Sequence, residues 1–451
     1  MDNKFDLTTG GILRKLIIVS LPVMGTQVMQ MLYNVTDMFW LGRLSSDAVA
    51  ASGAAGMYLW LSMSLLYLGR MGCEIGVSQN KGRGDMDTAR AYAQNAWLLA
   101  ALTGILYSAV MLLFTKRLVS FLNIQEPQVA RAARDYLWYA GIGIPATFLS
   151  GSITGAFNGS GNTRVPFFIN AAGLLLSTAA DPFMIFTFGF GIRGAAISTA
   201  LSQWLVSFAL LYAIKKDKNR PFFHFPLIWR LEPAKLAQIA RWGLPISLEI
   251  AFFSSLSILI TRLTASFGSD YLAISRVGGQ IESISWLISG GFGSALTTFM
   301  GQNYGAGKWD RIDDGFRVSS LAMLVWGALA TLTLILGGYR LFGLFLSDDK
   351  LCVLGATYLR FLAVCQITAC LNAVGAGYFR GCGRTVPPSA VSIICNSARV
   401  FICYYLASTA LGIYGVWIGI VASAFTRDGF TYVWSLIVML RQRARRKLAA
   451  V

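Results

Sequence analysis

Histidine is almost absent from this sequence, because His224 is the only one in 451 residues. Zinc sites built on several histidines, and most catalytic triads with a histidine base, are therefore excluded. Charged residues make up 13% of the chain, about half of the ~25% typical of soluble domains. The seven cysteines form no Cys-x-x-Cys pair, and no Gly-x-x-x-x-Gly-Lys-Ser/Thr motif for ATP phosphates occurs.

Apolar residues, in contrast, account for 55% of the chain. A membrane-spanning helix needs ~20 mostly apolar residues, and about twelve such runs follow one another here. We predict spans at 14–42, 47–78, 89–115, 132–157, 164–188, 192–215, 236–267, 270–300, 315–346, 351–379, 388–410 and 412–440. Only short loops remain between them, so the sequence predicts an all-α integral membrane protein without a soluble enzyme domain.

Basic residues outnumber acidic ones, with 38 Lys and Arg against 21 Asp and Glu. With the N-terminus inside, most of them fall on one face of the membrane, above all in a linker at 216–235 and a tail at 441–451. This asymmetry follows the positive-inside rule and predicts that both termini are cytoplasmic. The net charge of +17 could also indicate nucleic-acid binding, but topology explains it more simply and we expect no nucleic-acid partner.

Two loop motifs each occur twice. Residues 79–84 read Gln-Asn-Lys-Gly-Arg-Gly and residues 302–307 read Gln-Asn-Tyr-Gly-Ala-Gly, an offset of 223 (302 − 79). Residues 159–166 match residues 381–388 at an offset of 222 (381 − 159). Matches at nearly one offset indicate that the chain is a duplicated unit.

The duplication predicts two lobes, 1–215 and 236–440, joined by the cytoplasmic linker. An even number of spans in each copy means that both enter the membrane from the same side. We therefore expect two six-helix bundles related by a pseudo-two-fold axis along the membrane normal. Two matched bundles around a cavity favour an alternating-access carrier over a channel, which duplication can also build.

Among the carboxyl groups inside predicted spans are Asp37 in the first and Asp181 in the fifth. A charge at the bilayer centre costs at least ~2.5–3.5 kcal/mol on insertion scales, so each acid needs a reason. Buried carboxyl groups close to one another can exchange protons in the physiological range, as proton coupling requires. The alternative is structural: either acid could cap a broken helix, especially beside Pro182, or pair with an arginine such as Arg399.

The duplication favours the functional interpretation. The positions equivalent to Asp37 and Asp181 in the second copy are Ile260 and Cys403. The two acids are therefore not needed to build the fold.

The substrate cavity of such a carrier should combine aromatic and amide side chains. For any one such residue, ordinary helix packing is the more common role. The candidates for lining the cavity are Gln27, Gln30, Trp60, Gln203, Gln366 and Asn372.

The chain is similar to the MATE (multidrug and toxic compound extrusion) family of secondary transporters over nearly its whole length. The pairing of Asp37 with Asp181 resembles the DinF-like branch of that family. The marks of the resemblance are Leu21-Pro22, Tyr33-Asn-Val-Thr-Asp37, the paired Gln-Asn-x-Gly-x-Gly and Gly-x-Gly-x-Thr loops, and Asp181-Pro182. The resemblance implies a site in the first lobe, where protonation is coupled to substrate release, made of Tyr33, Asp37, Asp181 and Thr199, with Ser177 in place of a family asparagine.

The second lobe has acids of its own, Glu249 in the seventh span and Glu282 in the eighth. Other family members carry a cation-binding glutamate about one turn deeper than Glu249, near Phe253. Glu249 is thus equally consistent with a cation site and with a cavity-mouth residue paired with an arginine. Glu282 resembles an acid found in the eighth span of many bacterial members.

We therefore expect a secondary antiporter that exports hydrophobic, cationic organic compounds in exchange for H⁺ or Na⁺, with any Na⁺ bound at Asp37 and Asp181. It should be a monomer of the bacterial inner membrane, with the lipid bilayer and small organic substrates as partners, and with no cofactor or enzymatic activity. One alternative is a flippase for a lipid-linked or other amphipathic substrate, which predicts that Arg399 and Arg427 face inward. A channel and a membrane-embedded enzyme are further alternatives.

Overall fold

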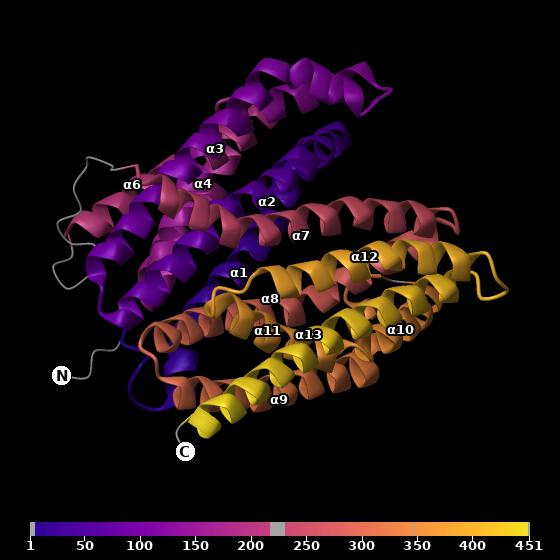
Figure 1. Cartoon of the computed structure of the whole chain (residues 1–451). Coiled ribbons are helices and arrows are strands. Elements are labelled where there is room, and N and C mark those ends of the chain that lie inside the picture. The colour runs from indigo at the N-terminus through magenta and orange to yellow at the C-terminus, as the bar shows by residue number, and fades with distance from the viewer. Residues whose placement is uncertain (1–4, 217–230, 347, 450–451) are drawn as a thin grey trace. The chain divides into compact units, whose positions relative to one another are not determined.

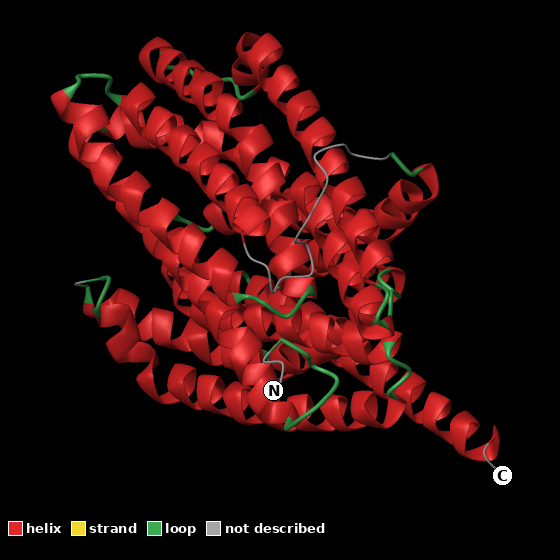
Figure 2. Cartoon of the chain, turned by 90° about the vertical axis from the view of Figure 1, so that its left-hand side faces the viewer, coloured by secondary structure: helices red, strands yellow, loops and turns green. Residues whose placement is uncertain are grey.

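The computed structural model describes residues 5–216, 231–346 and 348–449, so most of the predicted linker at 216–235 lies outside the described residues. Within these ranges the chain forms helices and no strands (Figure 2), which confirms the predicted all-α fold. The α-helices are α1 (Ile12–Leu44), α2 (Ser46–Arg83), α3 (Met86–Phe121), α4 (Pro127–Gly159), α5 (Arg164–Pro182), α6 (Ile192–Lys216), α7 (Pro233–Ala265), α8 (Ser269–Gly305), α9 (Trp309–Gly343), α10 (Asp349–Ala363), α11 (Gln366–Gly381), α12 (Val386–Ala407) and α13 (Ile413–Ala449). A short π-helix, η1 (Phe183–Thr187), follows α5.

Nine helices of the described ranges are long and apolar enough to cross a membrane, or ten if α10 and α11 together form one span. The two remaining predicted spans, 270–300 and 412–440, lie in α8 and α13. Each of these helices has 37 residues but carries charged residues within its length. The chain is therefore a membrane protein of many spans.

The tenth predicted span, 351–379, is not one straight helix. α10 and α11 meet at an angle of 41°. At the break the N–H groups of Val364 and Cys365 each bond a carbonyl three residues back, at 3.3 and 3.2 Å. The turn tightens there and the chain changes direction without a glycine or proline, so the sequence held no marker for this bend.

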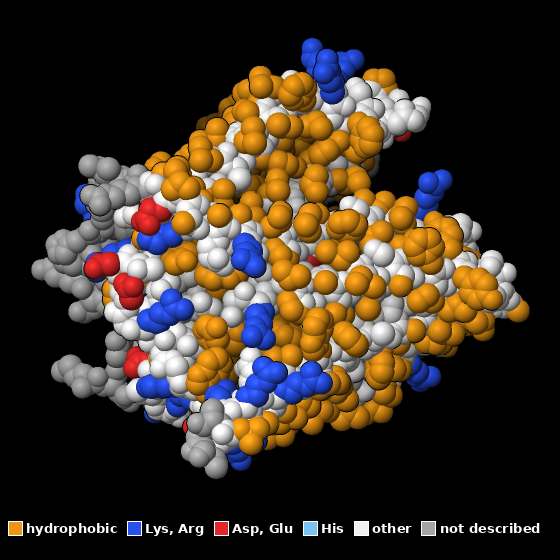
Figure 3. Space-filling view, in the orientation of Figure 1, with side chains coloured by type: hydrophobic (Ala, Val, Ile, Leu, Met, Phe, Trp, Pro, Cys, Tyr) orange, Lys and Arg blue, Asp and Glu red, His pale blue; other side chains and the backbone are white. Residues whose placement is uncertain are grey.

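The helix surfaces are strongly apolar. Large hydrophobic side chains are widely exposed, such as Leu113 at 78% and Leu336 at 80%. On the face drawn in Figure 3, apolar side chains cover most of the surface, and acidic side chains lie mainly at the left-hand end. A soluble monomer rarely exposes so much contiguous apolar surface, whereas contact with lipid requires it.

The chain folds as two compact units, and two of the boundaries between them fall inside helices, in α1 and in α7. Figure 1 labels both helices. Unit 1 contains Gly25–Ser247, and unit 2 contains Leu7–Met24 and Leu248–Val451. The first part of α1 thus belongs to unit 2, and the first part of α7 belongs to unit 1. The boundaries in α1 and α7 are equivalent positions of the duplicated unit, since 247 − 24 is 223, the offset between the paired loops.

The duplicated loops have the same backbone structure. Gly84 and Gly307 both adopt left-handed φ angles, of 81° and 67°, at the ends of α2 and α8. The N–H of the residue after each glycine donates to the Asn80 carbonyl at 3.0 Å and to the Asn303 carbonyl at 2.9 Å. These bonds satisfy carbonyls that a helix end leaves free, and only glycine adopts this conformation at little cost.

Close packing of helices is duplicated as well. A Cβ placed on Gly155 of α4 would lie 2.5 Å from the carbonyl oxygen of Arg70 in α2. At the equivalent contact, a Cβ on Gly377 of α11 would lie 3.0 Å from the carbonyl oxygen of Gly293 in α8. Small residues let membrane helices approach to backbone contact, which supplies much of their packing energy.

We expect Gly155→Ala to destabilise unit 1 by about 1–3 kcal/mol, because the added methyl group must force α2 and α4 apart. The measurement is the unfolding temperature of the detergent-solubilised protein. Gly53→Ala is the matched control, since no atom lies within 4 Å of a Cβ placed on this α2 glycine. Equal unfolding temperatures for the two variants would show that the α2–α4 contact tolerates a side chain.

Candidate functional site

The predicted coupling residues lie on three helices of unit 1. Tyr33 and Asp37 lie one turn apart in α1, and Asp181 occupies the last turn of α5. Pro182 has no N–H to continue the α-helical bonding, and the chain passes into η1, where the N–H of Phe188 bonds the Phe183 carbonyl at 2.9 Å, five residues back. π-Helical turns of this kind are frequent at functional sites.

A chain of hydroxyl groups joins the three helices. The Tyr33 hydroxyl forms a hydrogen bond with Thr199 Oγ1 of α6. Ser177 Oγ of α5 donates to the Tyr33 oxygen at 3.4 Å, and Thr199 Oγ1 donates to the Ala195 carbonyl at 3.0 Å. The structure therefore brings together Tyr33, Ser177 and Thr199, which lie far apart in the sequence.

The carboxyl groups of Asp37 and Asp181 lie near these hydroxyl groups and form no ion pair with a described lysine or arginine. Asp181 is fully buried, and its Oδ1 accepts a hydrogen bond from Ser198 Oγ of α6. Its Oδ2 and the Oδ1 of Asp37 are buried and have no hydrogen-bond partner among the described residues. The two carboxylates are close enough for their charges to repel each other.

None of the ion pairs between described residues includes Asp37 or Asp181. Arg399, the arginine considered as a structural partner, donates from Nε to Ser423 Oγ at 2.8 Å. An ionised carboxylate buried in this way is stable only when a proton or a cation accompanies it. A proton or a cation bound at the pair would supply that charge.

Ser198 was not among the predicted residues. It is buried next to Thr199 in α6, and its hydroxyl is the only donor to Asp181 among the hydrogen bonds of the described side chains. A serine inside an apolar helix carries no charge or motif, so its position beside Thr199 was the one available clue in the sequence.

Four of the residues predicted to line the substrate cavity lie in unit 1. Among the described residues, no hydrogen bond links any of them to each other or to Asp37. Trp60 is 67% exposed on α2. The predicted lining residues of unit 1 are Gln27, Gln30, Trp60 and Gln203.

In unit 2 the structure joins two predicted residues at the break between α10 and α11. Gln366 Nε2 donates to Glu282 Oε1 at 2.9 Å, while Gln366 Oε1 is buried without a hydrogen-bond partner among the described residues. Asn372 lies half-buried further along α11 and forms no hydrogen bond with another described residue. The bend therefore places an amide next to the buried acid of α8.

Glu249 is paired with an arginine. This pairing was expected if Glu249 is a cavity-mouth residue rather than a cation-binding residue. Arg380 Nη2 lies 3.4 Å from Glu249 Oε2, and Ser389 Oγ donates to the same oxygen at 2.8 Å. Both partners belong to unit 2. The charge of Glu249 is therefore compensated within the fold.

Asp428 is a buried acid that the sequence analysis missed. It is fully buried and forms a two-point contact with the adjacent Arg427, at 2.7 Å from Nε and 3.1 Å from Nη2. A charge inside a predicted span was the signal that could have identified it, as it identified Asp37. Here the charge is neutralised by a neighbour one residue away.

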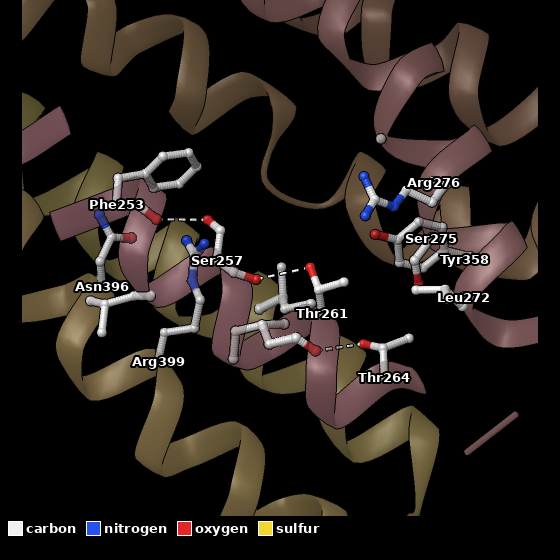
Figure 4. Close-up of a pocket in the computed structure, with 14 residues that line it drawn as sticks. Phe253, Ser257, Thr261, Thr264, Leu272, Ser275, Arg276, Tyr358, Asn396 and Arg399 are labelled. Atoms are coloured by element: carbon white, nitrogen blue, oxygen red, sulfur yellow. Dashed lines mark hydrogen bonds between the residues drawn. The ribbon is translucent and has the colours of Figure 1, made fainter. Parts of the chain in front are cut away.

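Unit 2 also contains a cavity of about 320 Å³. It is bordered by α7, α8 and α12, and the side chains that line it include Phe253, Arg276 and Arg399 (Figure 4). None of the six lining residues predicted from the sequence borders it.

Comparisons with known proteins agree with this architecture. The MatE family model matches residues 22–183 and 245–405, one segment in each half of the repeat. The "Probable multidrug resistance protein NorM" of Thermotoga maritima is 27% identical over 440 residues, which cover 96% of this chain and 94% of that protein.

Solved structures show the same fold. The crystal structure of MATE in the bent conformation matches with a TM-score of 0.92 and 21% identity, covering all of both chains. A MOP superfamily transporter from Pyrococcus furiosus, described as having a binding pocket of reverse polarity, matches with a TM-score of 0.90 and 20% identity. The match covers 97% of this chain and 98% of that one.

We expect Asp428→Asn to destabilise the protein by about 3–5 kcal/mol, because it leaves the Arg427 guanidinium buried without a counter-charge. Asp135→Asn is the matched control, since it removes an ion pair of similar length, 2.8 Å to Arg193, whose side chains are 37% and 52% exposed. That change should cost no more than about 1 kcal/mol. Thermal unfolding in detergent compares the two, and similar losses would contradict the buried pairing.

Proposed function

Because the chain belongs to the MatE family, we propose that it is a secondary antiporter that exports hydrophobic, cationic organic compounds in exchange for H⁺ or Na⁺. The observation that supports the proposal is the pair Asp37 and Asp181 in unit 1, which have no ion-pair partner among the described residues. Asp181 is fully buried, and Asp37 is half-buried with its Oδ1 shielded from solvent. The name of the Thermotoga relative, a probable multidrug resistance protein, supports drugs as the substrates. The proposed activity breaks no covalent bond, so it is not enzymatic.

In the proposed cycle, the ionised carboxylates of Asp37 and Asp181 attract the cationic substrate. Protonation of these carboxylates then releases the substrate. Each step keeps one positive charge near the pair, because an uncompensated carboxylate in the membrane is costly. The hydrogen-bonded hydroxyl groups of Tyr33, Ser177 and Thr199 support this exchange. A hydroxyl group both donates and accepts, so its hydrogen can rotate when a proton replaces the substrate cation. Pro22 in α1 and Pro245 in α7 interrupt helical hydrogen bonding and would absorb bending between two states.

Na⁺ is the alternative coupling ion. Carboxylate and hydroxyl oxygens are ligands that suit a hard cation, and Asp37, Asp181 and Ser198 supply such oxygens. Export from proteoliposomes under separately imposed Na⁺ and H⁺ gradients distinguishes the two ions.

We also propose that the protein is a monomer of a bacterial inner membrane, with both termini in the cytoplasm.

One observation favours a second candidate function, a flippase for a lipid-linked or other amphipathic substrate. That function predicts inward-facing arginines, and Arg399 lines the cavity of unit 2. Arg427, the other arginine considered, is instead neutralised by Asp428. Transport of a labelled lipid between leaflets, unaffected by either ion gradient, would support the flippase over the antiporter.

We expect Asp37→Asn to abolish ion-coupled export while the protein still folds and inserts, because the amide keeps the shape of the side chain but takes up no proton and carries no negative charge to attract a cation. Substrate export from proteoliposomes and drug resistance of cells measure the effect. Asp87→Asn is the control, an acid of α3 in unit 1 whose side chain is 92% exposed. Normal resistance in cells that carry Asp37→Asn would refute the assignment.

We expect Ser198→Ala to lower export about ten-fold, since the Asp181 carboxylate loses its donor and a charge-assisted hydrogen bond of this kind is worth about 1.5–3 kcal/mol. Ser198→Thr keeps a hydroxyl and should restore most of the activity. Initial export rates at several pH values provide the measurement. A purely structural serine would lower the rate equally at every pH and would not be rescued by threonine.

A further inference from the structure

The cavity of unit 2 carries positive charge. Its volume of about 320 Å³ lies at the lower end of the range for sites that bind drug-sized molecules. Arg276 of α8 and Arg399 of α12 line it, and no Asp or Glu is among the described residues of its wall. Figure 4 shows these two arginines on opposite sides of the cavity.

The charge of Arg399 is not neutralised by an ion pair. Its guanidinium donates to Ser423 Oγ at 2.8 Å, which is a neutral partner. The neighbouring Arg427 engages Asp428 at two points, so that acid is already occupied. Glu282 is near enough to interact with Arg399 through its charge, but it forms no ion pair with it and accepts a hydrogen bond from Gln366.

Arg276 adds a second positive charge. It is an exposed residue of α8 that lines the cavity. It forms no ion pair or hydrogen bond with another described residue. Two guanidinium groups without an ion pair on the wall of one cavity give it a positive potential that attracts anions.

The wall formed by α7 provides hydrogen-bond acceptors instead. Ser257, Thr261 and Thr264 donate their hydroxyl hydrogens to carbonyls of their own helix, at 2.7, 2.9 and 2.9 Å. Their oxygen lone pairs therefore remain for donors on a ligand. Phe253 and Ile260, on the same helix, add apolar surface.

We propose that this cavity binds an amphipathic organic anion that also carries hydroxyl or amine hydrogens. Its acidic group, a carboxylate, sulfonate or phosphate, binds Arg399, and Arg276 strengthens the attraction. Its hydroxyl or amine hydrogens bond to the α7 oxygens, and its ring or chain packs on Phe253. The site lies wholly in unit 2 and does not depend on the function proposed for Asp37 and Asp181.

Two dyes that share a xanthene ring but differ in charge test the proposal: fluorescein, an anion, and rhodamine 6G, a cation. Their binding to the full-length protein in phosphatidylcholine nanodiscs is followed by fluorescence anisotropy. We expect Arg399→Gln to weaken fluorescein binding by about ten-fold or more, the loss typical of a charge-assisted hydrogen bond. Rhodamine 6G binding should not change, and Arg399→Lys should lose less than Arg399→Gln.

Arg399→Gln also removes the contact with Ser423, so a second variant separates binding from folding. Arg276→Gln alters an exposed side chain and should weaken fluorescein binding several-fold without changing thermal unfolding. Arg340→Gln, an exposed arginine of α9 outside the cavity, is the matched control. Fluorescein binding that survives both Arg276→Gln and Arg399→Gln, or an equal loss of rhodamine 6G binding, overturns the proposal.

The same assay identifies the source of the anion. Phosphatidylglycerol added to the nanodiscs should displace fluorescein if the natural ligand is an anionic lipid. Unchanged fluorescein binding supports a soluble organic anion. Both results support the proposed site only where Arg399→Gln weakens the binding of fluorescein.

Discussion

An unpaired charge buried away from water is the constraint on which this molecule depends, because lipid offers no solvent to stabilise it. In unit 2 two acids are paired with arginines: Arg380 neutralises Glu249, and Arg427 neutralises Asp428. Unit 1 leaves the pair Asp37 and Asp181 without a cation among the described residues. The two halves of one duplicated fold therefore differ in how these acids are treated: Glu249 and Asp428 are ion-paired, whereas Asp37 and Asp181 are not.

The sequence predicted the helical membrane fold and its duplication because both rest on long, repeated patterns. The glycines of the paired loops identified equivalent helix ends, and the structure confirms that Gly84 and Gly307 share one backbone conformation. The acids Asp37 and Asp181 stood out because charge is rare inside a span. Each of these features depends on local composition, which a single sequence records directly.

Other features depend on which helices meet in space, and the sequence does not record that. Ser198 acquires its importance only because α6 faces Asp181. The bend after α10 arises from two tightened hydrogen bonds near Cys365 rather than from a proline. The amides proposed to line the substrate cavity, such as Gln27 and Gln203, were selected by residue type alone, which carries no information on the helices that they face.

The boundaries of the two units inside α1 and α7 have a consequence for dissecting the molecule. Ile239 of α7 is fully buried and lies so close to Gly72 that a Cβ there would be 2.6 Å from its side chain, although the linker separates Ile239 from the rest of unit 1 in the chain. A half-molecule ending at the linker would lack this segment and expose the groove that it fills. Separate halves would have to be cut inside both α1 and α7. Only unit 2, whose parts Leu7–Met24 and Leu248–Val451 lie far apart in the chain, would then need to be rejoined by circular permutation.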